Sequence, residues 1–299
     1  MRLTPFLTLV AFCLATISAS GKERLYCRQQ VVSPGAIGGG VIHTHGFSVE
    51  VAPTAQNPDD PGFGTCHATI RSPQGQTVFE ETEWGIEIDP VTGQDVNGDG
   101  QPDAVLTSYS GGAHCCWTYH IIRLGKQPRV VREFGSRTPA SFRDLEGDGR
   151  IEILVRDGEF DEAFGLNHAF SVFPLMILRL HGTKFEDDTA QFGRILEKEI
   201  QDERSKLNPQ EVREFLLSDP NEIHDDLDYT GTKSAILLIV LDYLYAGRPQ
   251  DARRVLGELW PKLYQDQTWE EMLKRYCSGC RARLGLALNS PCPAKAIAP

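Results

Sequence analysis

Two short loops rich in aspartate and glycine constrain the fold of this chain more than any other feature. The segment DVNGDGQPD begins at Asp95, and the segment DLEGDGRIE begins at Asp144. Both have the form D-x-[N/E]-G-D-G-x-x-[D/E], and each leads into an apolar, β-branched run that is typical of a buried strand. Glycine after the second aspartate favours a sharp turn, because a Cβ is costly there. The sequence therefore predicts two similar turns, each followed by a strand.

The two loops belong to a longer repeat. Each unit opens with glutamate, an aromatic residue and glycine, at Glu83 in the first and Glu133 in the second. Each also has a later strand pattern, HIIRLGK in the first and LMILRLHGTK in the second. The units cover about residues 83–130 and 133–185. A repeat built from short strands and turns is typical of stacked β units rather than of a parallel α/β sheet.

The repeat resembles the FG-GAP or VCBS-type units of integrin-alpha-like β-propellers over roughly residues 80–185. Phe134–Gly135 lies where that family has its phenylalanine–glycine pair, and Trp84–Gly85 is a looser version. The resemblance implies propeller-blade-like sheets with calcium loops. SGGAHCCW departs from the family pattern after the first loop, and two units are too few to close a propeller. The resemblance therefore supports the metal loop more than the overall architecture.

Calcium requires about six to eight oxygen ligands, and these loops offer them at matched positions. Positions 1, 3, 5 and 9 supply side chains, and position 7 supplies a backbone carbonyl. The predicted ligands are Asp95, Asn97, Asp99, Gln101 and Asp103 in the first loop, and Asp144, Glu146, Asp148, Arg150 and Glu152 in the second. Position 12 is Leu106 or Val155 and a strand follows, so neither loop is an EF-hand. The alternative is a solvated Asp-Gly turn that binds nothing.

The first twenty residues are typical of a secretory signal. They have an early arginine, an apolar run and small residues before Gly21, and the alternative is an uncleaved membrane anchor. No later segment is long enough to span a membrane, so we expect a periplasmic or extracellular protein. The formal charge of −11 argues against a nucleic-acid partner, because no basic stripe is available to neutralise phosphates.

The cysteine content fits an oxidising compartment. We expect one disulfide between Cys27 and Cys66 and one bridge among the C-terminal Cys277, Cys280 and Cys292. His114, Cys115 and Cys116 form the least ordinary stretch, and they are candidates either for disulfides or for a soft-metal or redox site.

Beyond residue 188 the apolar period changes from two to 3.6, which predicts helices. Asn208 followed by proline is a helix start, and SAILLIVLDYLYAG with RPQDARRVLGELWP reads as a helical hairpin that turns at Gly247. The hairpin is similar to one tetratricopeptide repeat, although a generic α-hairpin also accounts for it. Thr268 and Glu271 form a capping box that predicts the start of a last helix.

The sequence thus predicts an α+β protein with a signal peptide at 1–20, a β domain at 21–188 and a helical domain at 189–299. No common catalytic motif is present. We therefore expect an exported, calcium-binding, non-enzymatic module that recognises a protein or a glycan. The alternative is an enzyme or a redox or soft-metal protein that uses the loop of His114, Cys115 and Cys116.

Overall fold

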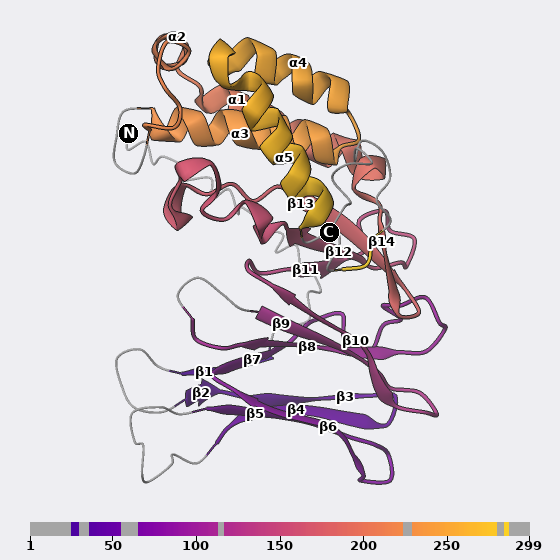
Figure 1. Cartoon of the computed structure of the whole chain (residues 1–299). Helices are drawn as coiled ribbons and strands as arrows, with labels where there is room; N and C mark the ends of the chain where they lie inside the picture. Colours follow the sequence, from indigo (N-terminus) through magenta and orange to yellow (C-terminus); the bar gives the residue numbers. More distant parts are fainter. Residues whose placement is uncertain are drawn as a thin grey trace, which may run out of the picture.

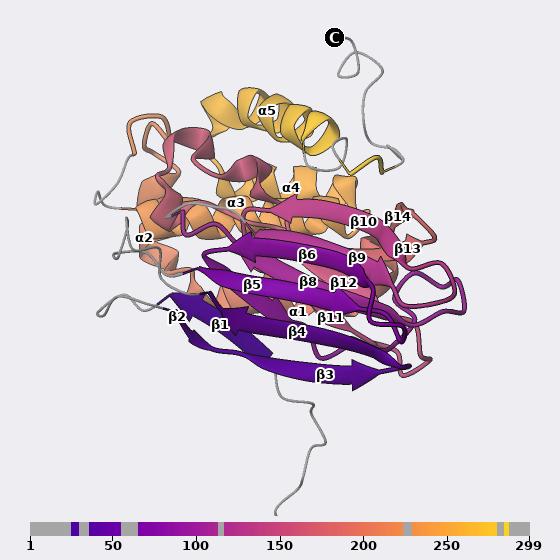
Figure 2. The same cartoon turned by 90° about the horizontal axis from the view of Figure 1, so that it is seen from below.

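The computed structural model describes residues 25–29, 36–54, 65–112, 117–223, 229–279 and 284–286. Three antiparallel sheets are stacked in layers, and the α-helices form a further layer beside the third sheet (Figure 1). Figure 2, viewed from the side of the first sheet, shows the strands of the three layers running in similar directions with the helices behind them. The predicted α+β class is confirmed.

Each sheet contains four strands that are consecutive in the chain and pair with their neighbours. The first sheet consists of β3 (Gly40–Thr44), β4 (Phe47–Pro53), β5 (Cys66–Arg71) and β6 (Thr77–Glu83). The second consists of β7 (Gly85–Ile88), β8 (Asp103–Tyr109), β9 (Trp117–Arg123) and β10 (Arg129–Ser136), with β1 (Leu25–Gln29) and β2 (Ala36–Gly38) added beyond β7. The third consists of β11 (Ser141–Arg143), β12 (Glu152–Arg156), β13 (Leu175–His181) and β14 (Lys184–Asp187).

The second sheet lies between the first and the third, and its strands carry apolar side chains on both faces. In β8, Ala104 and Leu106 point into the core shared with the first sheet, and Val105 between them points into the core shared with the third. Successive side chains of a strand face opposite sides, so a strand buried on both sides reads as a continuous apolar run. This explains why the sequence after each loop lacks a polar alternation.

A disulfide joins the first two sheets. Cys27 of β1 is bonded to Cys66 of β5, with the two Cα atoms 5.7 Å apart, which confirms the predicted pair. Cys277 is also disulfide-bonded. Its two predicted candidate partners, Cys280 and Cys292, lie outside the described residues.

The C-terminal region forms helices, as the 3.6-residue period predicts. They are α1 (Gly193–Lys206), α2 (Pro209–Phe215), α3 (Thr230–Tyr245), α4 (Pro249–Leu259) and α5 (Gln265–Ser278). The Asn208 side chain accepts a hydrogen bond from the Gln210 N–H at 2.9 Å and caps α2, as predicted. The predicted start of the last helix at Thr268 is wrong, because a 3₁₀ turn at Lys262–Tyr264 leads directly into α5 at Gln265.

Helix α3 is buried on nearly all sides and joins the helices to the third sheet. One hydrophobic cluster runs without a break from Val105 and Tyr119 of the second sheet, through Ile153 and Ile177 of the third, to Leu237 of α3. The helices and the third sheet therefore share a core, although the limits of the two domains stay a prediction. None of the described helices combines the length and apolar character needed to cross a membrane.

Candidate functional site: two aspartate loops

The two aspartate-rich segments occupy the same place in two sheets. The first loop (residues 95–103) joins β7 to β8, and the second loop (residues 144–152) joins β11 to β12. In each loop the ninth residue, Asp103 or Glu152, is the first residue of the following strand. The structure therefore places the sequence repeat at the same strand connection twice.

The backbones of the two loops match. Both glycines of each loop have a positive φ, with values of 69° and 78° at Gly98 and Gly100 and of 74° and 85° at Gly147 and Gly149. Residues with a Cβ rarely adopt this conformation, so the glycine spacing is what allows the turn.

In the first loop, carboxylate oxygens accept hydrogen bonds from the loop's own N–H groups. Asp95 accepts from the N–H groups of Asp99 at 3.1 Å and Gly100 at 2.7 Å. Asp99 accepts from the Gln101 N–H at 2.9 Å. Asn97 reaches out of the loop, because its side-chain amide donates to the Gly182 carbonyl at 3.2 Å in the turn between β13 and β14. The first loop thus contacts both the second and the third sheet.

Asp103 differs from the other aspartates of this loop because it is fully buried and one of its carboxyl oxygens has no hydrogen-bond partner in the described chain. Oδ2 accepts from the Val96 N–H at 2.9 Å, and the oxygen without a partner within the described residues is Oδ1. Burial raises the pKa of Asp103 to about 7, against the opposing effect of the Val96 and Asn97 N–H groups, and the nearby charges of Asp99 and Asp95 add to the rise. A buried carboxylate oxygen without a partner is costly, so this atom is where the loop lacks a positive group.

Arg123 brings a positive charge to the first loop but does not reach this oxygen. It lies directly across from Asp103 in the pairing of β8 with β9. Its guanidinium pairs with Asp99 instead, and its Nε is buried with no partner among the residues described.

The second loop repeats these local contacts. Asp144 accepts from the N–H groups of Asp148 at 3.1 Å and Gly149 at 2.9 Å. Glu152 accepts from the Leu145 N–H at 2.7 Å, as Asp103 does from Val96. The two loops therefore differ in their surroundings rather than in their fold.

Arg179 fills the position that is unsatisfied in the first loop. It lies across from Glu152 in the pairing of β12 with β13, as Arg123 lies across from Asp103. Nε binds Glu152 at 2.7 Å, Nη2 binds Glu146 at 2.8 Å and Nη1 binds Asp188 at 3.0 Å. Burial alone would lower the pKa of Arg179, but Glu152, Asp188 and Glu146 raise it, so the guanidinium stays charged.

The fit of a metal ion to the two loops follows from these contacts. Among the described residues, no group of three or more histidine, cysteine, aspartate or glutamate side chains is already arranged to hold a metal ion. The first loop fits a hard cation because its donors are oxygens and Asp103 Oδ1 is a buried carboxyl oxygen without a hydrogen-bond partner in the described chain. The second loop fits less well, since the Arg179 guanidinium occupies two predicted ligands, Glu146 and Glu152, whereas Arg123 occupies one predicted ligand, Asp99, in the first loop. A metal ion in the second loop would therefore have only Asp144, Asp148 and the Arg150 carbonyl as predicted ligands.

Sequence reasoning missed Arg123, Arg179 and Asp188. Each arginine stands inside an apolar strand at the same place in both repeat units, in HIIRLGK and in LMILRL. A charged residue repeated within a buried strand was the signal that could have identified them. The other predicted site, formed by His114, Cys115 and Cys116, lies outside the described residues.

Comparison with known proteins assigns no family. No family model matches the chain, and no solved structure matches it. A stretch of 116 residues is 29% identical to y4bJ, an uncharacterized protein of Sinorhizobium fredii (strain NBRC 101917 / NGR234). The match covers 37% of this chain and only 18% of that protein's length. The chain is therefore similar to a small part of a larger protein whose description names no activity.

Proposed function

We propose that the protein is an exported, non-enzymatic module that binds one calcium ion at the first loop and recognises a protein or a glycan. The observation that carries the calcium assignment is the buried Asp103 Oδ1, which has no partner within the described residues. Asp95, Asn97, Asp99 and Asp103 would supply side-chain oxygens, and Gln101 its carbonyl. When bound, calcium would supply the positive charge that these carboxylates lack.

The ion would have a structural role. The first loop bonds the turn between β13 and β14 through Asn97 and Gly182, in both directions, at 3.2 and 2.8 Å. Ordering this loop would therefore strengthen the junction between the second and third sheets. The binding free energy would add to folding stability, because the unfolded chain has no such site.

Three features support the wider proposal. Each sheet contains a four-stranded antiparallel meander, the arrangement expected of propeller-blade-like FG-GAP or VCBS-type units. The three described cysteines, Cys27, Cys66 and Cys277, are all in disulfides, which accords with a periplasmic or extracellular location. The hairpin of α3 and α4 resembles a tetratricopeptide unit and adds a helical surface to the β layers.

Thermal unfolding with calcium and with chelator tests the calcium site. Calcium should raise the melting temperature by about 5 °C, since a ligand at a hundred times its Kd adds about 2.7 kcal/mol to stability. Asp99→Ala should remove most of this rise. Asp148→Ala, the same substitution at the same position of the second loop, is the matched control and should keep it.

An identical melting curve in excess chelator and in calcium would reject the proposal. Loss of the calcium response in Asp148→Ala alone would move the site to the second loop and reject the assignment to Asp103.

A further inference from the structure

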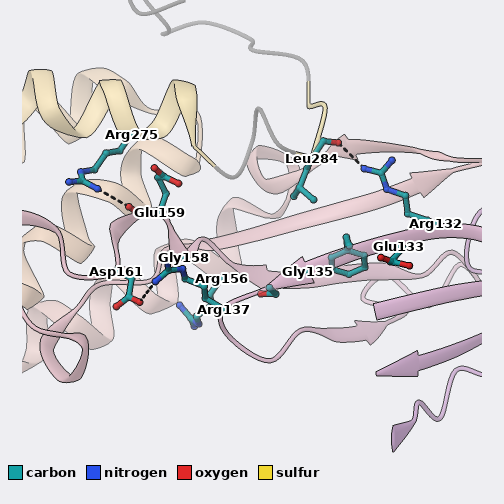
Figure 3. A pocket seen from close by; sticks show the side chains of 12 residues that line it. Arg132, Glu133, Gly135, Arg137, Arg156, Gly158, Glu159, Asp161, Arg275 and Leu284 are labelled. Atoms are coloured by element: carbon teal, nitrogen blue, oxygen red, sulfur yellow. Dashed lines mark hydrogen bonds and ion pairs between the residues drawn. The ribbon is translucent and has the colours of Figure 1, made fainter. Parts of the chain in front are cut away.

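A cavity of about 620 Å³ lies between the second sheet, the segment after β12 and helix α5 (Figure 3). One wall is the chain from Arg132 to Arg137, which is the second half of β10 and the residue that follows it. Gly158, Glu159 and Asp161 line the opposite side, and Arg275 of α5 also borders it. Neither aspartate loop contributes a lining residue, so this cavity is separate from the proposed calcium site.

The wall formed by β10 is a sheet edge. β10 is the outermost strand of its sheet and pairs only with β9 among the described strands. Apart from the ladder with β9, no backbone hydrogen bond joins residues 132–137 to other described backbone groups. A strand edge of this kind presents N–H and C=O groups that can pair with another extended chain.

Two glycines line the cavity. Gly135 in β10 is exposed, and a Cβ there would meet only the Trp117 carbonyl oxygen at 3.8 Å. Gly158 lets the Arg137 side chain pack closely against it, because a Cβ there would meet that side chain at 2.8 Å. Glycine inside a strand often marks a place where another backbone approaches closely.

Arg132 brings an unbalanced positive charge to one end of the cavity. Its guanidinium donates to the carbonyls of Thr183 at 3.3 Å and Leu284 at 3.2 Å and lies over the Phe185 ring, with no carboxylate partner in the described chain. The other three arginines that line the cavity each form an ion pair with a carboxylate. The pairs are Arg137 with Asp161, Arg156 with Glu199, and Arg275 with Glu271. Among the four arginines that line the cavity, Arg132 is therefore the one without an ion-pair partner in the described chain.

None of the three acidic lining residues forms an ion pair with Arg132 within the described chain. The Glu159 side chain lies beside Gly279, where a Cβ would meet its Cδ at 2.7 Å. Asp161 is bonded by Arg137 at 2.6 Å and by His168 at 2.7 Å, so both of its oxygens are engaged. Glu133 lies 3.4 Å from the His120 ring nitrogen.

We propose that this cavity binds an extended peptide segment of a partner protein, which pairs with the free edge of β10 and places one carboxylate side chain against Arg132. Strand addition of this kind takes affinity from backbone hydrogen bonds and specificity from side-chain sites. The inference rests on the proposed function only in naming its partner, and it needs no calcium.

The free edge of β10 favours a peptide over an acidic glycan as the ligand of this cavity. A glycan has no regular row of amide donors and acceptors to match a strand. Phe134 is the cavity's one aromatic lining residue within the described chain, and at 6% exposure it offers no ring face for a sugar to stack on.

Fluorescence anisotropy of the full chain with a labelled hexapeptide that alternates valine and glutamate tests the proposal. The peptide should bind saturably in calcium and in chelator alike. Replacing its glutamates by lysine, or N-methylating alternate amides, should weaken binding about tenfold or more, because each removes charge-assisted or backbone hydrogen bonds.

Substitutions of single arginines test whether the peptide carboxylate contacts Arg132. Arg132→Gln should weaken binding about tenfold, and Arg132→Lys should recover part of it, because lysine keeps the charge but not the planar fork. Arg275→Gln, a substitution on the surface of α5, should weaken it less and keeps the test open should Arg132→Gln fold poorly. Arg254→Gln on α4, whose guanidinium pairs with Asp251 and Glu258 away from the cavity, is the control and should bind like the wild type.

Absence of saturable peptide binding, or equal binding by Arg132→Gln, would overturn the proposal. So would displacement of the peptide by an acidic polysaccharide together with no effect of N-methylation, since the cavity would then be a glycan site. Failure of the calcium melting test with intact peptide binding would reject the metal site alone.

Discussion

Asp103 in the first loop and Glu152 in the second open equivalent strands, are both fully buried and both accept an N–H from the second residue of their loop. They differ in what meets the other oxygen. Glu152 receives Arg179 at 2.7 Å, whereas no described side chain pairs with Asp103 Oδ1. The same backbone therefore occurs once with a guanidinium on the buried carboxylate and once with one oxygen of that carboxylate unpaired within the described residues.

The choice of acidic residue contributes to this difference. Glutamate at 146 and 152 is one methylene longer than asparagine or aspartate at 97 and 103, so these carboxylates extend to a guanidinium on the neighbouring strand. Asp188 supplies a third carboxylate to Arg179. In the first loop, Arg123 instead binds Asp99.

Removing the Arg179 guanidinium should have the largest effect. Arg179→Met leaves the buried Glu152 without its partner, and breaking one side of a buried ion pair costs about 3–5 kcal/mol. Urea denaturation at pH 7 should show this loss, and calcium should restore part of it by replacing the guanidinium. Arg150→Met removes an exposed arginine from the same loop and should change stability little. A similarly small change in Arg179→Met would mean that the loops do not differ as described.

A buried carboxylate away from both loops provides a pH reference. Burial raises the pKa of Asp242 in α3 to about 8, with Glu199 adding to the rise and Arg156 opposing it. An unfolded aspartate loses its proton near pH 3.8, so the folded state holds more protons between these values and stability falls as pH rises through them. Asp242→Asn should remove this fall, which is at most about 1.4 kcal/mol per pH unit.

Urea unfolding at pH 5, 6, 7 and 8 measures the slope. Calcium should leave the Asp242 contribution unchanged, because this residue is in α3 and not in a loop. An equal slope in the wild type and in Asp242→Asn would contradict the assignment of the pH dependence to this carboxyl.

The shared backbone predicts a smaller, equal effect in both loops. Gly100 and Gly149 have φ values of 78° and 85°, and no neighbouring atom lies within 4 Å of a Cβ placed at either. Alanine at each should cost about 1 kcal/mol from the left-handed conformation alone. Chemical denaturation in chelator should give matching losses for Gly100→Ala and Gly149→Ala. Clearly unequal losses would show that the two backbones respond differently.

Most of the features that the sequence predicted correctly were indicated by local residue patterns. The aspartate and glycine spacing located both loops, and the 3.6-residue period located the hairpin of α3 and α4. The start of α5 was misplaced because Thr268 and Glu271 satisfy a capping pattern inside a helix that begins earlier, at Gln265. A short motif cannot distinguish these two cases.

Contacts between strands that are distant in sequence were not predictable in this way. Arg179 lies 27 residues from Glu152, and an insertion between β12 and β13 hides its equivalence to Arg123. The meander of β3 to β6 was also missed as a third unit, because it has no aspartate loop to mark it. The cores on both faces of the second sheet depend on packing that periodicity alone does not specify.

The number of calcium ions bound per chain tests the central claim most directly. Isothermal titration calorimetry of the wild type should give one ion, lost in Asp99→Ala and kept in Asp148→Ala, with a second weak ion gained in Arg179→Met. Two ions bound by the wild type, or none, would contradict an account in which the first loop requires a cation and the second carries its own.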